Sequence, residues 1–296
     1  MTDARNLTLD LGGKWHGRYG VAPCPICQPE KRRGQNALTL STGSDGRLLA
    51  HCKKAGCDFR DLAAALGLRS GDFARPDEAE TLARSRGLVA EADKRARQAE
   101  AIWREAQPIA GTPAETYLRF RGITCELPDT LRFYPLCWHG ATAQRLPALV
   151  ALVAGCDRLA VHRTYLRPDG LGKAAAEPAK TMLGATAGGA VTLQDGAGRL
   201  VVAEGIETAL SLASGLLPLP VRLVAALSTS GMQALRLPAQ PGRLTIASDS
   251  DDGGAGLAAA RTLAERAYAL GWQVSLLPAP EGQDWNDVLT RKGNAA

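Results

Sequence analysis

Four cysteines in the first 60 residues form two close pairs, which is the pattern of a metal site. Two residues separate Cys24 from Cys27, and four separate Cys52 from Cys57. Structural zinc sites need four thiolate or imidazole ligands at tetrahedral corners, and two short-range pairs supply them. We therefore expect these cysteines to bind one structural Zn²⁺; two pairs of reduced, buried thiols are the alternative. His51 adjoins Cys52, but on a strand its side chain would point the other way.

Basic residues surround both cysteine pairs. They are Lys31, Arg32, Arg33, Lys53 and Lys54. We expect the first three in particular to contact nucleic-acid phosphates, although ordinary surface charge would explain them too. The net charge of +5 and the pI of about 8.9 permit a polyanionic partner without requiring one.

A second group of reactive residues is acidic and lies in the last third of the chain. Glu204 follows an apolar run at 201–203, and Asp249 and Asp251 follow another at 244–247. The carboxyl ends of strands in an open parallel sheet form a ligand crevice, and residues two apart on an extended chain face the same side. Three carboxylates converging there would need a hard cation between them. We expect a catalytic Mg²⁺ or Mn²⁺ site; helix capping and turns are the alternative.

A third acidic element surrounds Asp284. It follows the last expected strand and can reach the same crevice, so Asp284 is a further candidate ligand for Mg²⁺. The same residues also match a capping box that opens a final helix, and both roles can hold at once.

The elements that position these acids alternate between strand and helix. We expect strands at 199–203, 221–227, 244–247 and 273–277, with helices after the first three. Short links between alternating strands and helices indicate a parallel sheet covered on both faces. In the cysteine region we expect a hairpin of strands 36–41 and 47–52, then a helix beginning at Phe59. The predicted segments are a zinc ribbon at 1–70, a helical connector at 71–107, a mixed segment at 108–195 and the strand–helix segment at 196–296.

Both ends of the chain resemble parts of known primases. The motifs VVAEGIETAL, IASDSDDGGAG and GQDWNDVL resemble the Toprim domain shared by bacterial-type primases, type IA and II topoisomerases and some nucleases. The segment from CPIC to HCKKAGCDFRDLAAALGL resembles the zinc-binding domain of bacterial and phage primases. The motif VHRTYLRPDGLGKAAAEPAKTMLG is similar to the N-terminal half of a primase catalytic core. The resemblance implies an α/β fold in which a primase-type zinc ribbon and an α+β primase-core segment precede a Toprim-type parallel sheet flanked by helices.

The sequence departs from those families at three positions. Cys27 stands where many primase zinc sites have His, and Thr208 stands where bacterial primases often have an Asp metal ligand. Asn286 replaces the second carboxylate of the last acidic motif.

The resemblance implies a DNA primase, which makes short RNA primers on single-stranded DNA from NTPs. Glu204, Asp249 and Asp251 would hold the catalytic ions. We expect Arg163, Lys173 and Lys180 to contact nucleotide phosphates or template; surface charge is the alternative. The nearest likeness is to Toprim proteins of prophages, plasmids and mobile elements. A Toprim nuclease and a non-catalytic nucleic-acid-binding protein of a mobile element remain alternatives.

Further expectations concern partners and location. No G-x-x-x-x-G-K-[ST] loop occurs, so a replicative helicase would be a separate partner. No run approaches the roughly 20 apolar residues of a membrane span, and we expect a cytoplasmic protein with no membrane partner. In a reducing compartment the remaining cysteines, Cys125, Cys137 and Cys156, would be buried thiols.

Overall fold

The structure is a computed structural model that describes residues 3–32, 34–43, 46–68, 78–250 and 253–294. The chain divides into two compact units, residues 1–90 and 91–296. Within the described part of the chain, no helix is long and apolar enough to cross a membrane.

The first unit is built on a four-stranded antiparallel sheet. Its strands, in spatial order, are β1 (Lys14–Trp15), β2 (Tyr19–Ala22), β3 (Leu38–Thr42) and β4 (Leu48–Cys52), accompanied by helices α1 (Ala4–Asp10) and α2 (Phe59–Ala65). The β3–β4 pair confirms the predicted hairpin. Helix α2 begins as expected, because the Asp58 side chain accepts a hydrogen bond from the Arg60 amide. The buried apolar set is small, with Leu38, Leu40 and Leu62 at its centre, which leaves much stabilisation for a metal ion to supply.

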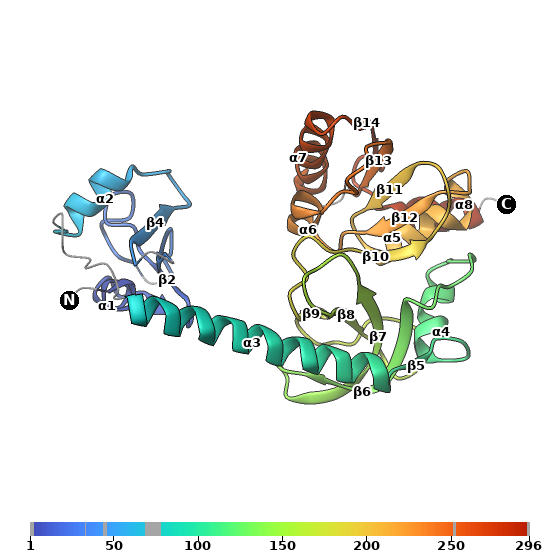
Figure 1. The fold of residues 1–296 in the computed structure, drawn as a ribbon, viewed down its shortest axis with the longest axis horizontal. Helices are drawn as coiled ribbons and strands as arrows, with labels where there is room; N and C mark the ends of the chain where they lie inside the picture. The colour runs from blue at the N-terminus through green and yellow to red at the C-terminus, as the bar shows by residue number, and fades with distance from the viewer. Residues whose placement is uncertain (1–2, 33, 44–45, 69–77, 251–252, 295–296) are drawn as a thin grey trace. The chain divides into compact units, whose positions relative to one another are not determined.

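The second unit opens with an antiparallel sheet. Its strands, in spatial order, are β5 (Gln107–Pro108), β6 (Leu131–His139), β7 (Gln144–Val153), β8 (Ala160–Tyr165) and β9 (Lys180–Leu183). The end of the long helix α3 (Glu78–Glu105) lies along one face of this sheet (Figure 1). Ala99 and Trp103 of this helix pack against the sheet there. Helix α4 (Pro113–Phe120) packs Tyr117 and Leu118 against the other face.

The other sheet of the second unit, called the second sheet below, carries the acidic residues. Its spatial order is β10 (Val191–Gln194), β12 (Arg222–Ala225), β11 (Leu200–Ala203), β13 (Arg243–Ser248) and β14 (Gln273–Pro278). The last four strands are parallel, which confirms the predicted parallel sheet. Strand β10 was not predicted; it comes from the mixed segment and pairs antiparallel with β12 at the edge.

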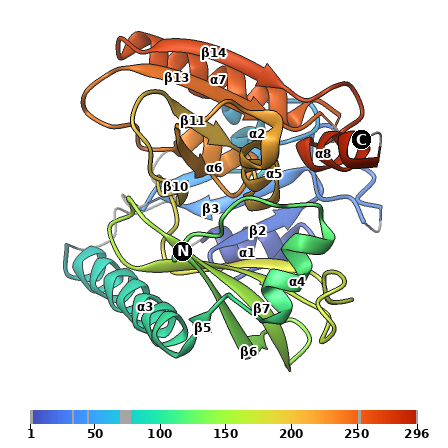
Figure 2. The same cartoon turned by 90° about the vertical axis from the view of Figure 1, so that its right-hand side faces the viewer.

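Helices cover both faces of this second sheet, as expected (Figures 1 and 2). One face is covered by α6 (Thr229–Ala234) and α7 (Ala255–Ala269), and the other by α5 (Ile206–Ser211), the π-helical turn η1 (Leu212–Leu216) and α8 (Trp285–Asn294). Alternate side chains of β11 serve the two faces: Leu200 and Val202 pack with α7, whereas Val201 and Ala203 pack with α5. This arrangement puts the carboxyl ends of β11 and β13 side by side.

Candidate metal centres and the basic cluster beside them

The four cysteines of the first unit lie around one point. Their sulfur atoms are all within 4.8 Å of one another. The Sγ atoms of Cys24 and Cys57 are 3.8 Å apart, and those of Cys27 and Cys52 are 3.5 Å apart. In a tetrahedral site with Zn–S distances of about 2.3 Å, the sulfur atoms lie roughly 3.8 Å apart. The cluster therefore has the size and chemistry of a zinc site. His51 is exposed and is not part of it.

The backbone around Cys52 favours its thiolate, whereas burial raises the pKa values of Cys27 and Cys57. Burial alone would raise the pKa of Cys52, but hydrogen bonds from the backbone at Ala55 and neighbouring residues lower it to about 6. The amide of Ala55 lies 3.5 Å from the Cys52 sulfur. Gln28, which is buried, holds the loop of the first pair by accepting hydrogen bonds from the amides of Cys24 and Ala37. A thiolate is the form in which cysteine binds a metal.

The basic residues near the cluster are at the surface. Lys31, Arg32, Lys53 and Lys54 are all exposed, as a phosphate contact requires. Arg33 lies outside the described residues.

The carboxylates of the second unit follow two neighbouring parallel strands. Ala203 of β11 is in register with Ala247 of β13, so Glu204 and Asp249 leave the sheet at the same edge. Both residues are half-buried. Asp251, the third expected ligand, lies outside the described residues, so its convergence with the other two stays a prediction.

The carboxylate of Asp249 is held by two protein donors. The Thr208 hydroxyl donates to its Oδ2 at 2.8 Å, and the backbone amide of Trp285 donates to its Oδ1 at 3.2 Å. Thr208 therefore binds the neighbouring acid at the position where bacterial primases often have Asp. The adjoining loops are also joined, because the Ser250 amide donates to the Gln283 carbonyl at 3.0 Å.

Asp284 belongs to the loop that reaches Asp249, and it caps the last helix. Its Oδ1 accepts the Asp287 amide at 2.7 Å, while Asp287 accepts the Asp284 amide at 3.3 Å. The guanidinium of Arg121 lies 3.7 Å from Asp284 Oδ2. The capping interpretation of this motif is thus confirmed, and a metal-binding role stays a prediction. Asn286 is buried and donates to the Arg121 carbonyl and the Ser211 hydroxyl, so its amide is structural.

A buried acid that the sequence did not single out joins two of the predicted lysines. Glu207 is in the first turn of α5. Its Oε2 accepts a hydrogen bond from Lys180 at 3.0 Å, and its Oε1 accepts one from the Tyr117 hydroxyl at 2.9 Å. The ammonium group of Lys173 lies 3.9 Å from the same Oε1. The side chain of Glu207 is only 7% exposed, whereas each lysine is 38% exposed.

The charges of this basic cluster, formed by Glu207, Lys173 and Lys180, are set by mutual attraction and burial. Burial would raise the pKa of Glu207, but the two ammonium groups outweigh it and hold that pKa well below its usual range. Burial lowers the pKa of Lys173, and the Glu207 charge opposes that effect. His162 is buried nearby, and burial together with the Lys180 charge lowers its pKa to about 4. At neutral pH the imidazole is therefore uncharged, and the three charged groups sum to one positive charge.

Arg163 is positioned separately from this cluster. Its guanidinium donates to the Trp138 carbonyl at 3.4 Å and lies 5.8 Å from the centre of the Tyr165 ring. Of the three basic residues of the second unit that we expected to contact nucleotide phosphates or template, the structure therefore brings together Lys173 and Lys180.

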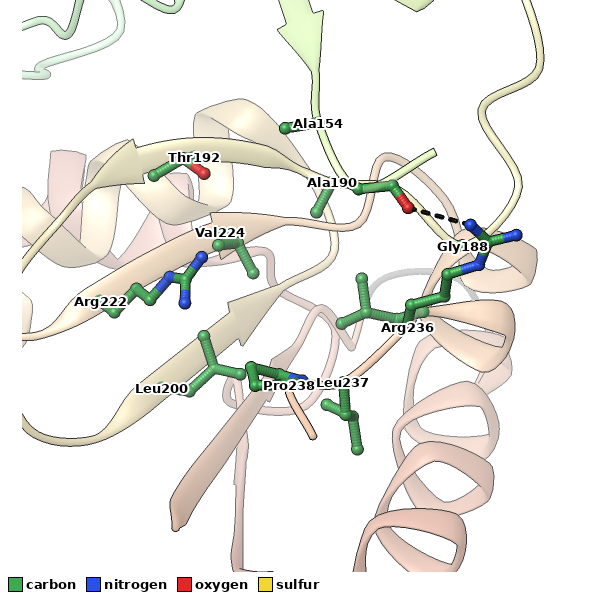
Figure 3. A pocket seen from close by; sticks show the side chains of 12 residues that line it. Ala154, Gly188, Ala190, Thr192, Leu200, Arg222, Val224, Arg236, Leu237 and Pro238 are labelled. Atoms are coloured by element: carbon green, nitrogen blue, oxygen red, sulfur yellow. Dashed lines mark hydrogen bonds between the residues drawn. The ribbon is translucent and has the colours of Figure 1, made fainter. Parts of the chain in front are cut away.

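A hollow of about 330 Å³ lies beside the parallel strands β11 and β12, near the end of β11 opposite to the carboxylates. Leu200 and Val224 line it together with Arg222 and Arg236, as Figure 3 shows. Leu200 is the first residue of β11, whereas Glu204 follows its last, so this hollow is separate from the carboxylates. Arg236 is bound to Asp157 at 2.6 Å.

Two protein-family models match parts of the second unit. The Toprim domain matches residues 199–295, which confirms the resemblance of the C-terminal segment. Residues 93–193 match a domain of unknown function, DUF7146. No curated protein matches the chain.

Several solved primase structures show distant similarity. A DNA primase domain from Pseudomonas aeruginosa is 18% identical, with a TM-score of 0.43 over 67% of this chain and 75% of its own. The zinc-binding and RNA polymerase domains of the Aquifex aeolicus primase are 13% identical, with a TM-score of 0.41 over 100% and 84%. The primase fragment of the bacteriophage T7 primase-helicase is 11% identical, with a TM-score of 0.37 over 93% and 96%.

Proposed function

We propose that this protein is a DNA primase that makes short RNA primers on single-stranded DNA. The observation that carries the proposal is the placement of Glu204 and Asp249 at the ends of neighbouring parallel strands within the Toprim match. Carboxylates so placed suit Mg²⁺ or Mn²⁺. Such an ion would help a primer 3′ hydroxyl to attack a nucleotide α-phosphate, by activating the hydroxyl and neutralising phosphate charge.

Each part of the chain has a role in this proposal. Glu204 and Asp249 would hold the ion, with Asp251 and Asp284 as further candidate ligands. Thr208 and the Trp285 amide fix the orientation of Asp249. The cysteine cluster would be a zinc ribbon whose exposed lysines and arginines contact the template. The same proposal includes a separate helicase, a mobile-element origin and a cytoplasmic location. It also keeps the expected division of the chain into segments 1–70, 71–107, 108–195 and 196–296.

One assay separates primase activity from its alternatives. Single-stranded DNA, four NTPs and Mg²⁺ or Mn²⁺ are incubated with the protein, and both primers and DNA fragments are resolved on a gel. A primase yields short RNA that disappears without template. Cleaved DNA without RNA would identify a nuclease, and a mobility shift without product would identify a non-catalytic binder. Either of these two outcomes would overturn the proposal.

A further inference from the structure

Glu207 is an unusual residue in this region because it is an almost fully buried carboxylate. A buried charge costs several kcal/mol unless it is paired and hydrogen-bonded. Tyr117 of α4 and Lys180 of β9 bind one oxygen each, and Lys173 approaches from the loop between β8 and β9. Three separate parts of the antiparallel sheet region thus meet one acid of the Toprim segment.

The positive charge in this cluster exceeds what Glu207 needs. Within the described part of the chain, the salt bridges of Lys173 and of Lys180 both go to this one carboxylate. His162 adds no charge at neutral pH because its pKa is about 4. The ammonium groups keep part of their surface open to solvent, so a positive charge remains available to an anion. Phosphate is an anion that lysine commonly binds as a point charge.

The position of Glu207 links this charge to the carboxylates that we propose bind the catalytic ion. Glu207 lies three residues after Glu204 in the chain, and its neighbour Thr208 donates to Asp249. A lysine side chain is flexible and loses rotamer freedom when it binds a ligand. Holding two ammonium groups against one fixed carboxylate removes part of that cost before the ligand arrives.

We propose that Glu207 is a positioning residue, which holds Lys173 and Lys180 where they bind the triphosphate of the incoming nucleotide. This inference rests on the proposed function, because the triphosphate is the substrate of that reaction. Glu207 itself repels phosphate and does not touch it. Its effect is exerted through the two lysines, so it should act on nucleotide affinity more than on the chemical step.

The inference has a consequence for pH dependence. Glu207 on α5, Lys180 on β9 and Arg121 at the end of α4 are the charged groups that face Lys173. Of these only Glu207 favours its protonated form. Removing that negative charge therefore lowers the pH at which Lys173 loses its proton. Nucleotide binding by a Glu207→Gln variant should fail at a lower pH than binding by the unchanged protein.

The test uses the full chain, loaded with zinc, in four forms. These are the unchanged protein, Glu207→Gln, Glu207→Asp and Glu115→Gln. Glu115 is the matched control, because it is a glutamate on α4 that is bound by Arg119 at 3.1 Å and by the Gly111 amide at 2.8 Å instead of by these lysines. Calorimetric binding of ATP with Mg²⁺ and of inorganic tripolyphosphate is measured from pH 7 to pH 9.5, alongside KM and kcat for primer synthesis.

We expect Glu207→Gln to weaken ATP and tripolyphosphate binding and to raise KM by about tenfold, with kcat within about twofold. The defect should be smaller at pH 7 than at pH 9. Glu207→Asp keeps the charge, so its binding should be intermediate with the pH profile of the unchanged protein. It also keeps the buried ion pair, so it provides the test if Glu207→Gln does not fold. Glu115→Gln should behave as the unchanged protein.

Two results would overturn the inference. One is a calorimetric result in which the unchanged protein does not bind tripolyphosphate, or in which both Glu207 variants bind it as tightly as the unchanged protein does. The other is a fall in kcat alone with an unshifted pH profile, which would indicate a structural role. If the unchanged protein makes no primers but binds tripolyphosphate in a Glu207-dependent way, the proposed function fails and the positioning role stands.

Discussion

The cysteine cluster and the acidic edge of the second sheet are both candidate metal centres, but the protein prepares them differently. The four sulfur atoms of the cluster lie mainly against one another, in a unit with a small apolar core. Asp249 instead already accepts hydrogen bonds from Thr208 and Trp285, in a unit with an extensive core. The first site should therefore depend on its metal for folding. The second should need its metal for chemistry alone.

Zinc removal should have the largest effect. Structural zinc contributes on the order of 10 kcal/mol to small metal-dependent domains, so Cys52→Ser should abolish zinc binding and unfold residues 3–68. Elemental analysis should find one zinc per chain, and hydrogen exchange should locate the unfolding. Cys156→Ser changes a half-buried thiol of the second unit and should keep the zinc. Equal loss of protection in residues 91–296 would contradict the contrast between the sites.

Replacing an acid at the second site should leave the fold intact and stop the reaction. Glu204→Gln and Asp249→Asn should each lower primer synthesis at least about 100-fold, or about 3 kcal/mol in activation free energy. Binding to single-stranded DNA should change little, because these acids do not carry the positive charge that binds phosphates. Rates and thermal unfolding are measured on the same samples. Full activity of Glu204→Gln would remove the carboxylate site from the proposed function.

The buried His162 gives a pH signature specific to the second unit. Its pKa is about 4 in the folded protein and about 6.5 when unfolded, so the unfolded chain binds the extra proton between these values. Stability should therefore fall as the pH drops from 6.5 to 4, by roughly 3 kcal/mol from this group alone. Urea unfolding of His162→Gln should show a flatter dependence over that window. If the free energy of unfolding has the same pH dependence in both proteins, the acid sensitivity comes from another group. His16→Gln in the first unit is the control.

The smallest effect is expected at Thr208, which orients Asp249 without replacing it as a ligand. Thr208→Val removes the hydroxyl donor and should lower kcat about tenfold. A hydrogen bond to a charged group contributes roughly 1.5 kcal/mol, which corresponds to that factor. Thr208→Ser keeps the donor and should stay within about twofold. Identical rates for Val and Ser would show that the hydrogen bond does not position Asp249 for the reaction.

The sequence predicted the parts of both sites that depend on local spacing. Two short cysteine pairs indicated the cluster, and apolar runs ending in acids indicated the adjacent strand ends of Glu204 and Asp249. Glu207 escaped notice because it looks like an ordinary first-turn acid of a helix. Its partners Lys180 and Tyr117 are 27 and 90 residues away, and only the folded chain brings them together. Strand β10 was missed for a similar reason, since its pairing with β12 spans about 30 residues.

The edge strand β10 has a practical consequence for dissecting the molecule. Its residues precede both the predicted boundary at 196 and the Toprim match that begins at 199, yet they complete the sheet beside β12. A fragment that begins at either position would leave the backbone amides and carbonyls of β12 exposed along one edge. Such an edge recruits strands from other chains and leads to aggregation. Recombinant fragments of this region should therefore start before Val191, and poor solubility of shorter ones would reflect the missing strand.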